Sequence, residues 1–104
     1  MPEDLIGLRV EIESRESQVA GDKNELNLLL RMLTEKKRKE YNHQENEAIS
    51  FTFDISSDTA ENVALEMEKS GMILEEDTRT IAKLLSDKLK QFREDRSLHR
   101  KEQE

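Results

Sequence analysis

The sequence contains no cysteine and no tryptophan, and its few aromatic side chains are three phenylalanines and one tyrosine. The absence of cysteine excludes disulfides and thiolate metal ligands, and it fits a reducing compartment. Aromatic side chains supply many of the large apolar contacts in recognition sites, so their distribution matters here. Phe51 and Phe53 stand in one Phe-Thr-Phe triplet, which therefore holds much of the aromatic binding capacity of the chain.

The chain also lacks long apolar runs. None approaches the roughly 20 residues that a membrane-spanning helix requires, and the first residues lack the basic and hydrophobic regions of a signal peptide. We therefore expect a cytoplasmic protein without a membrane partner, and its two charged ends suggest a segment of a longer protein. Because 39% of the 104 residues are charged, one domain with a small core is expected.

Seventeen basic and 24 acidic side chains give a net charge of −7. This balance argues against a nucleic-acid partner, which needs clustered positive charge, and favours a basic or uncharged ligand. Catalytic groups are scarce, because His43 and His99 lie far apart in charged stretches and no serine stands in a nucleophile-elbow or phosphate-loop sequence. Calcium-loop and zinc-ligand spacings are missing as well. We expect a non-enzymatic protein without metal or cofactor.

Three stretches, 5–13, 25–33 and 48–55, show the two-residue apolar alternation of half-buried strands. The second stretch is also compatible with a helical turn, although its length and flanks favour a strand. The alternating apolar residues are Ile6, Leu8, Val10, Ile12; Leu26, Leu28, Leu30, Met32; and Ile49, Phe51, Phe53, Ile55.

Polar segments separate these stretches. Residues 14–24 contain the turn formers Gly21, Asp22 and Asn24 and are interpreted as a connector. Residues 34–47 are compatible with either a short helix or a mobile loop. Their basic run, 36–39, is interpreted as a solvated surface or as a docking patch for acidic groups.

Two helices are expected after the third strand. Asp58, with Glu61 three residues later, is typical of an N-cap in a capping box, so the first helix should begin near Thr59. Gly71 supplies the left-handed residue that ends such a helix. The second helix should begin near Glu76, with the acids at 75–77 at its start, where the helix dipole favours them. The expected apolar faces are Ala60, Val63, Ala64, Met67 on the first helix and Ile81, Leu84, Leu85, Leu89, Phe92 on the second.

Together these patterns predict an α+β fold, with a small antiparallel sheet of about three strands packed against two helices. Apolar residues almost vanish after Phe92. We therefore expect a domain over residues 1–92 and a charged tail, helical or frayed, over residues 93–104.

The stretch FTFDISSDTAENVALEMEKSGM resembles the core motif of the PF2-like family, found as the autoinhibitory domain of WNK kinases and as the conserved C-terminal domain of oxidative-stress-responsive kinases. The family pattern is Phe-x-Phe, then Asp-Thr, a helix carrying Glu, and a Ser-Gly or Ala-Gly pair. The residues that match it are Phe51, Phe53, Asp58, Thr59, Glu66 and Gly71. The likeness is specific over 46–72 and diffuse over the rest of 7–92.

The resemblance implies a domain whose groove binds Arg-Phe-x-Val or Arg-Phe-x-Ile peptides and which restrains the kinase domain of its own protein. Carried over by position, Phe51 lines the groove and Phe53 completes the motif. Asp58 and Glu66 receive the peptide arginine, and Met72 stands where the family places leucine or another apolar residue.

Other interpretations stay open. Alternation alone makes Phe51 and Phe53 ordinary core residues, and Glu66 an exposed surface residue. Glu68 departs from the family, whose members usually carry Val or Ile there, and an uncompensated carboxylate at the edge of the apolar stripe would be costly. The alternative function is a structural module in which the second helix and the charged tail drive self-association.

Overall fold

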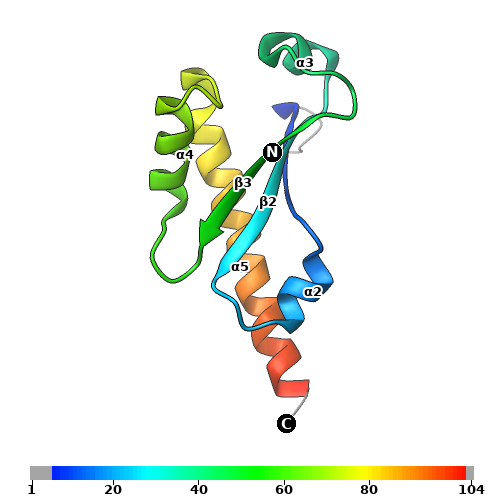
Figure 1. Ribbon diagram of the computed structural model, residues 1–104, viewed down its shortest axis with the longest axis vertical. Helices are drawn as coiled ribbons and strands as arrows, with labels where there is room; N and C mark the ends of the chain where they lie inside the picture. The colour runs from blue at the N-terminus through cyan, green and yellow to red at the C-terminus, as the bar shows by residue number, and fades with distance from the viewer. Residues whose placement is uncertain (1–5, 103–104) are drawn as a thin grey trace.

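The computed structural model of the protein describes residues 6–102, and its three strands form one antiparallel sheet in the order β1-β2-β3. The strands are β1 (Leu8–Ile12), β2 (Glu25–Met32) and β3 (Ala48–Asp54). The helices are α2 (Arg15–Ala20), α3 (Glu35–Tyr41), α4 (Ala60–Lys69), the 3-10 turn η1 (Glu75–Asp77) and α5 (Thr78–Glu102), as Figure 1 shows. The expected α+β class is confirmed. The expectations for residues 1–5 and 103–104 lie outside the described residues.

The sheet register places the alternating apolar residues on one face. In the central strand β2, Leu28 lies opposite Ile12 of β1 and Phe51 of β3, and the neighbouring Leu26 lies opposite Phe53. Leu26 and Leu28 are completely buried, whereas Asn27 between them is exposed. The two-residue period of a strand therefore holds over 25–32, and the helical alternative for this stretch is wrong.

Helix α5 provides the cover for the buried face of the sheet. It runs behind the strands and continues beyond their lower end to Glu102 (Figure 1), and it packs on β1, α2 and α4. Its buried residues include Ile81, Leu85, Leu89 and Phe92 of the expected stripe, whereas Leu84 is only half-buried. The helix has no break at residue 92, and Arg96 beyond it is buried.

Four α-helices, rather than the expected two, are found over residues 6–102. The connector expected at 14–24 contains α2, whose single buried residue, Val19, gives no helical periodicity in the sequence. The polar segment at 34–47 contains α3, so the short-helix alternative is the correct one. The Thr34 hydroxyl caps α3 by accepting from the Lys37 amide at 3.2 Å.

Buried polar side chains fasten α3 to the start of α5. Asp77 is 6% exposed and accepts from Lys37 Nζ at 2.8 Å and from the Tyr41 hydroxyl at 2.6 Å. Burial, together with the Asp77 hydrogen bond, raises the pKa of Tyr41, so its hydroxyl remains protonated and donates at neutral pH. Desolvation opposes the charge on Lys37, but hydrogen bonds to Asp77 and Glu40 outweigh it and raise the pKa of the amine.

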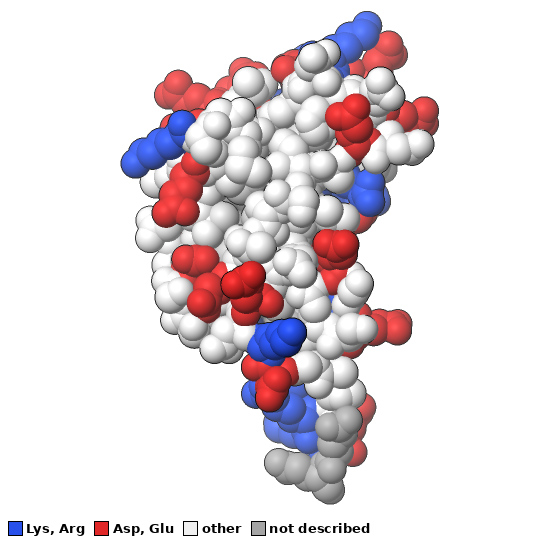
Figure 2. Space-filling view, in the orientation of Figure 1, with Lys and Arg blue, Asp and Glu red and all other residues white. Residues whose placement is uncertain are grey.

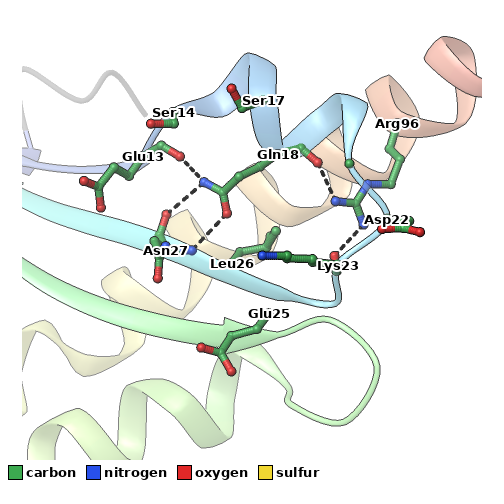
Figure 3. Close-up of a pocket in the computed structure, with 11 residues that line it drawn as sticks. Glu13, Ser14, Ser17, Gln18, Asp22, Lys23, Glu25, Leu26, Asn27 and Arg96 are labelled. Carbon is green, nitrogen blue, oxygen red and sulfur yellow. Dashed lines mark hydrogen bonds between the residues drawn. The ribbon is translucent and has the colours of Figure 1, made fainter.

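Polar contacts also fasten α2 to α5. Arg96, 5% exposed, donates to the backbone oxygens of Gln18 and Lys23 and stacks 4.6 Å from the ring centre of Phe92. The Gln18 side-chain amide bridges the backbones of Glu13 and Asn27, where β1 and β2 meet (Figure 3). The hollow of about 380 Å³ in Figure 3 is therefore bordered by groups that bind one another.

The helix cap before α4 differs from the expected one. Thr59, rather than Asp58, is the N-cap, and its hydroxyl accepts from the Asn62 amide at 3.2 Å. The Asp58 carboxylate turns back and accepts from the Asp54 amide at 2.9 Å, because this amide lies at the end of β3 within its reach. The expected stop at Gly71 is confirmed by its φ of 81° and by the Met72 amide, which donates to the Met67 oxygen at 2.9 Å.

The carboxylate of Glu68 has a partner, which corrects the expectation of an uncompensated charge. It accepts from the Thr78 hydroxyl at 2.6 Å, at the first residue of α5. Thr78 also lies 3.3 Å from the Leu74 oxygen. An acid near a helix N-terminus interacts favourably with the helix dipole, so Glu68 joins the end of α4 to the start of α5.

Replacing Glu68 by valine should lower the free energy of unfolding by about 1 kcal/mol, because the hydrogen bond from Thr78 is lost. Glu68→Gln keeps an acceptor at the same place and should cost less. Chemical denaturation of the three proteins measures both changes, and a more stable Glu68→Val protein would show that the carboxylate is a net cost.

Replacing Arg96 by alanine should lower the free energy of unfolding by on the order of 2 kcal/mol, because two backbone oxygens lose their charged donor and the buried packing of Arg96 on Phe92 is lost. Arg100, one turn further along α5, is exposed, so Arg100→Ala serves as the matched control and should change stability by less than about 0.5 kcal/mol. Thermal and denaturant unfolding measure the difference. Equal stability of the two variants would show that the Arg96 hydrogen bonds do not stabilise the packing of α2 on α5.

Candidate functional site

A groove of about 620 Å³ lies between the outer strand β3 and helix α4. β3 has a strand neighbour on only one side, and α4 packs mainly on α5. Ser50, Phe51 and Thr52 of β3 form one wall, and residues of α4 form the other. In Figure 1 the ribbon of α4 lies to the side of β3, and side chains of both elements border the groove.

Four of the five residues predicted for the site line this one groove: Phe51, Asp58, Glu66 and Met72. They come from β3, the loop before α4, α4 itself and the loop after it. The fifth, Phe53, does not line it. Phe53 is 1% exposed in the core, where it pairs with Leu26 and borders a separate hollow beside α5.

Phe51 and Phe53 point to the same side of β3, yet their surroundings differ. Phe51 is 8% exposed, so part of its ring surface is available at the floor of the groove. Val63 and Met67, both buried residues of α4, complete an apolar floor with it. The groove thus has an apolar base beside an open strand edge, an arrangement suited to an extended peptide with one large apolar side chain.

The acidic groups of the groove differ in how firmly they are held. Asp58 is half-buried and fixed by the Asp54 amide, which occupies one of its oxygens and leaves other lone pairs for a ligand. Glu66 is exposed, and its carboxylate makes no hydrogen bond or ion pair with another residue of the described chain. Both carboxylates therefore have acceptor capacity for a guanidinium.

The charge around the groove is mainly negative. Hydrogen bonds from the Ser56 hydroxyl and amide hold the pKa of Asp54 below its usual value, which keeps this neighbour of Asp58 ionised. In Figure 2 the middle of the visible face, over the strands and the adjoining side of α4, is largely uncharged, and acidic side chains with some basic ones among them border it. An apolar centre with an acidic border matches a ligand that carries both a cation and an apolar group.

Several wall residues of the groove were not predicted from the sequence. Val63 and Met67 belong to the predicted apolar stripe of α4, so helical periodicity contained the signal for them. Ser50 and Ser70 also line the groove, and no sequence pattern singled them out. Among residues 6–102, no set of three or more His, Asp or Glu side chains is arranged to hold a metal ion. Within the same range, no helix is both long and apolar enough to cross a bilayer.

Comparisons with known proteins identify a family for this chain. Residues 26–90, which include all of β2 except its first residue, β3, α4 and most of the buried part of α5, match the family described as the oxidative-stress-responsive kinase 1 C-terminal domain. This match covers more than half of the chain and contains every residue predicted for the site.

Individual relatives agree with the family match. The chain is 46% identical to the serine/threonine-protein kinase WNK of Caenorhabditis elegans over 95 residues, 91% of the chain. It is 39% identical to WNK3 of Mus musculus over 84 residues, 80% of the chain, and 40% identical to Wnk of Drosophila melanogaster over 81 residues, 77% of the chain.

These alignments cover only 5%, 4% and 3% of the lengths of those three kinases. The similarity therefore concerns a small regulatory segment of each protein rather than its whole length. The chain belongs to the oxidative-stress-responsive kinase 1 C-terminal domain family, in a form that it shares with WNK kinases.

Proposed function

We propose that this domain is a non-catalytic peptide-docking module that binds Arg-Phe-x-Val or Arg-Phe-x-Ile segments and restrains a WNK-type kinase domain in its own protein. The observation that carries the proposal is the assembly of Phe51, Asp58, Glu66 and Met72 around one groove. These residues come from separate segments of the chain, so their meeting there is a property of the fold.

The proposed ligand matches the groove in chemistry. The peptide arginine binds between Asp58 and Glu66, whose free lone pairs accept its planar donors. The peptide phenylalanine packs against Phe51 and the buried side chains of α4, and the Val or Ile reaches the wall near Met72. β3 offers unpaired backbone groups along the sheet edge, which allow an extended peptide to align beside the strand.

The self-association alternative has less support in the described structure. Its exposed large hydrophobic side chains are Leu65 on α4 and Leu98 on α5, which are 43% and 57% exposed. A single exposed leucine on α5 does not make the repeated apolar seam that a helical dimer needs. Sedimentation of the isolated chain at low concentration tests this alternative, and a stable dimer without peptide would favour it.

Phe51 and Phe53 separate binding from stability. Phe51→Ala should leave a folded but less stable domain that binds an Arg-Phe-x-Val peptide at least tenfold more weakly, because the groove loses its floor. Phe53→Ala should lose about 3–5 kcal/mol of stability, since it empties a fully packed position. Amide resonance dispersion reports folding, and fluorescence anisotropy of a labelled peptide reports affinity.

The same pair tests kinase restraint in a protein that joins the domain to its kinase. Both changes should raise kinase activity, because the proposal assigns docking and restraint to one surface. A folded Phe51→Ala domain that retains both peptide affinity and inhibition would remove this residue from the site and refute the proposed function.

The carboxylates provide a second test. Glu66→Ala should weaken peptide binding by about 1 kcal/mol, since the residue is exposed, and Glu66→Lys should weaken it further by repelling the arginine. Asp58→Asn should cost about 1–3 kcal/mol of binding at a better shielded position.

Glu61→Ala is the matched control for these carboxylates, because Glu61 is an exposed acid on α4 that does not line the groove. Its peptide affinity should match that of the unaltered domain. Calorimetric titration at two salt concentrations measures each effect. Unchanged affinity in both Glu66 variants would exclude Glu66 from arginine binding.

A further inference from the structure

The sheet has a second open edge, on the side away from the groove. β1, the blue strand beside β2 in Figure 1, pairs within residues 6–102 with β2 alone, in a register that is continuous over its whole length. Leu8 and Val10 are buried and Ile12 is half-buried, whereas the alternate residues Arg9 and Glu11 have side chains that are 40% and 33% exposed. An edge strand of this kind carries unpaired backbone groups that can bind another strand.

The hydrogen bonds to β2 show which backbone groups of β1 are left over. At the two ends of the strand pair, the Leu33 amide donates to the Gly7 oxygen at 2.8 Å, and the Glu13 amide donates to the Asn27 oxygen at 2.9 Å. In an antiparallel pair, hydrogen-bonded and non-hydrogen-bonded positions alternate, so the odd-numbered residues of β1 are the ones bonded to β2. The amides and carbonyls of residues 8, 10 and 12 therefore point to the open side.

A second copy of β1 fits this edge with two-fold symmetry. When the two strands run antiparallel with Val10 opposite Val10, Leu8 lies opposite Ile12 of the second copy, and the outward backbone groups of residues 8, 10 and 12 meet partners. On the solvent face, Arg9 then lies opposite Glu11 of the second copy. This position belongs to the closer of the two antiparallel spacings, where opposite charges attract.

Other registers of the same two strands are disfavoured. A shift by one residue turns the apolar side chains of one copy to the solvent face of the sheet. A shift by two residues places Arg9 opposite Arg9, or Glu11 opposite Glu11. A parallel pair in register also sets each charge beside its like, which is destabilising. The charges of β1 therefore select the antiparallel register centred on Val10.

Half-buried apolar side chains accompany the open edge. Ile12 lines a hollow of about 430 Å³ together with Lys88 and Gln91 of α5. Leu84 lies one turn before Lys88 on the same side of α5, and it is also only half-buried. In a two-fold pair both copies of α5 lie on the same face of the joined sheet, so contacts between the copies cover Ile12 and Leu84.

We propose that the edge of β1 is an interface between two copies of this chain, which joins the three strands of each copy into one antiparallel sheet. The Arg9–Glu11 pairs extend a network in which Glu11 already binds Arg31 at 2.8 Å and Arg9 at 3.5 Å. A five-residue strand pair makes a small interface, so the dimer is reversible, with a Kd on the order of 100 μM. The groove between β3 and α4 lies at the opposite edge and stays open in both copies.

The first test uses the unaltered 104-residue chain. Sedimentation should show a monomer at low micromolar concentration and mainly a dimer at millimolar concentration. Over the same range, hydrogen exchange of the outward Val10 amide should slow by about fivefold, whereas the Arg9 and Glu11 amides, bound to β2, should be protected throughout. A chain that stays monomeric at millimolar concentration, or a dimer without added protection of Val10, would overturn the inference.

Two charge reversals test the register. Arg9→Glu places acids opposite one another across the interface, and Glu11→Arg places arginines there, so each variant alone should stay monomeric at millimolar concentration. An equal mixture of the two restores opposite charges at both positions and should dimerise as the unaltered chain does. A mixture that stays monomeric, or a single variant that dimerises as well as the unaltered chain, would overturn the inference. If Glu11→Arg does not fold, the exchange of the Val10 amide decides.

Leu98→Glu is the control for contacts made elsewhere on α5, because Leu98 is 57% exposed and lies three turns beyond Leu84. It should dimerise as the unaltered chain does. A dimer that is lost in Leu98→Glu and kept in Arg9→Glu belongs to the end of α5 and overturns the inference. Arg9→Glu should bind the Arg-Phe-x-Val peptide with unchanged affinity, so the dimer and the proposed function fail separately.

Discussion

The packing of α4 on α5, rather than on the sheet edge, is the constraint on which the groove depends. The buried side chains of α4 are Val63, Ala64 and Met67, a narrow stripe on a helix that packs mainly on α5, and two of them, Val63 and Met67, also line the groove. A helix with so narrow an apolar face cannot cover a strand on its other side as well. The outer edge of β3 therefore stays open, and part of the Phe51 ring borders a groove instead of a closed core.

Polar interactions hold the peripheral elements around this arrangement. Asp77 gathers Lys37 and Tyr41, while Arg96 binds two backbone oxygens of the segment around α2. A buried charge is costly unless it is paired, so these clusters define which elements meet more than they add net stability. Through Tyr41 the Asp77 cluster also borders a separate hollow of about 340 Å³ that Met72 lines too, so the packing of α3 shapes the surface near Met72.

Alternation and helical periodicity predicted the three strands, the class of the fold and the buried stripe of α5, because long apolar patterns have few structural solutions. The short helix α2 was not predicted, since Val19 alone provides its buried contact. Arg96 was assigned to a charged tail, although it extends the spacing of Leu89 and Phe92 by one turn. Its burial depends on backbone oxygens far away in the sequence, and no local pattern contains that information.

The cap of α4 shows the same limit at the site itself. Asp58 and Thr59 are both suitable N-caps, and the choice between them depends on the Asp54 amide at the end of β3. With Thr59 as the cap, one oxygen of Asp58 is held by a single amide, and the other remains available to the groove.

The use of Thr59 rather than Asp58 as the N-cap matters for the proposed recognition. A carboxylate that accepted hydrogen bonds from helix amides would have less capacity for a guanidinium. An exposed Glu66 contributes little by itself, since solvent and salt screen its charge. Specificity for the arginine must therefore come mainly from a carboxylate fixed in place, and affinity from the apolar floor beside it. The loop that joins β3 to α4 supplies the fixed carboxylate of Asp58, and the groove between β3 and α4 exposes the apolar floor. The proposed site therefore requires both the cap at Thr59 and the separation of α4 from β3.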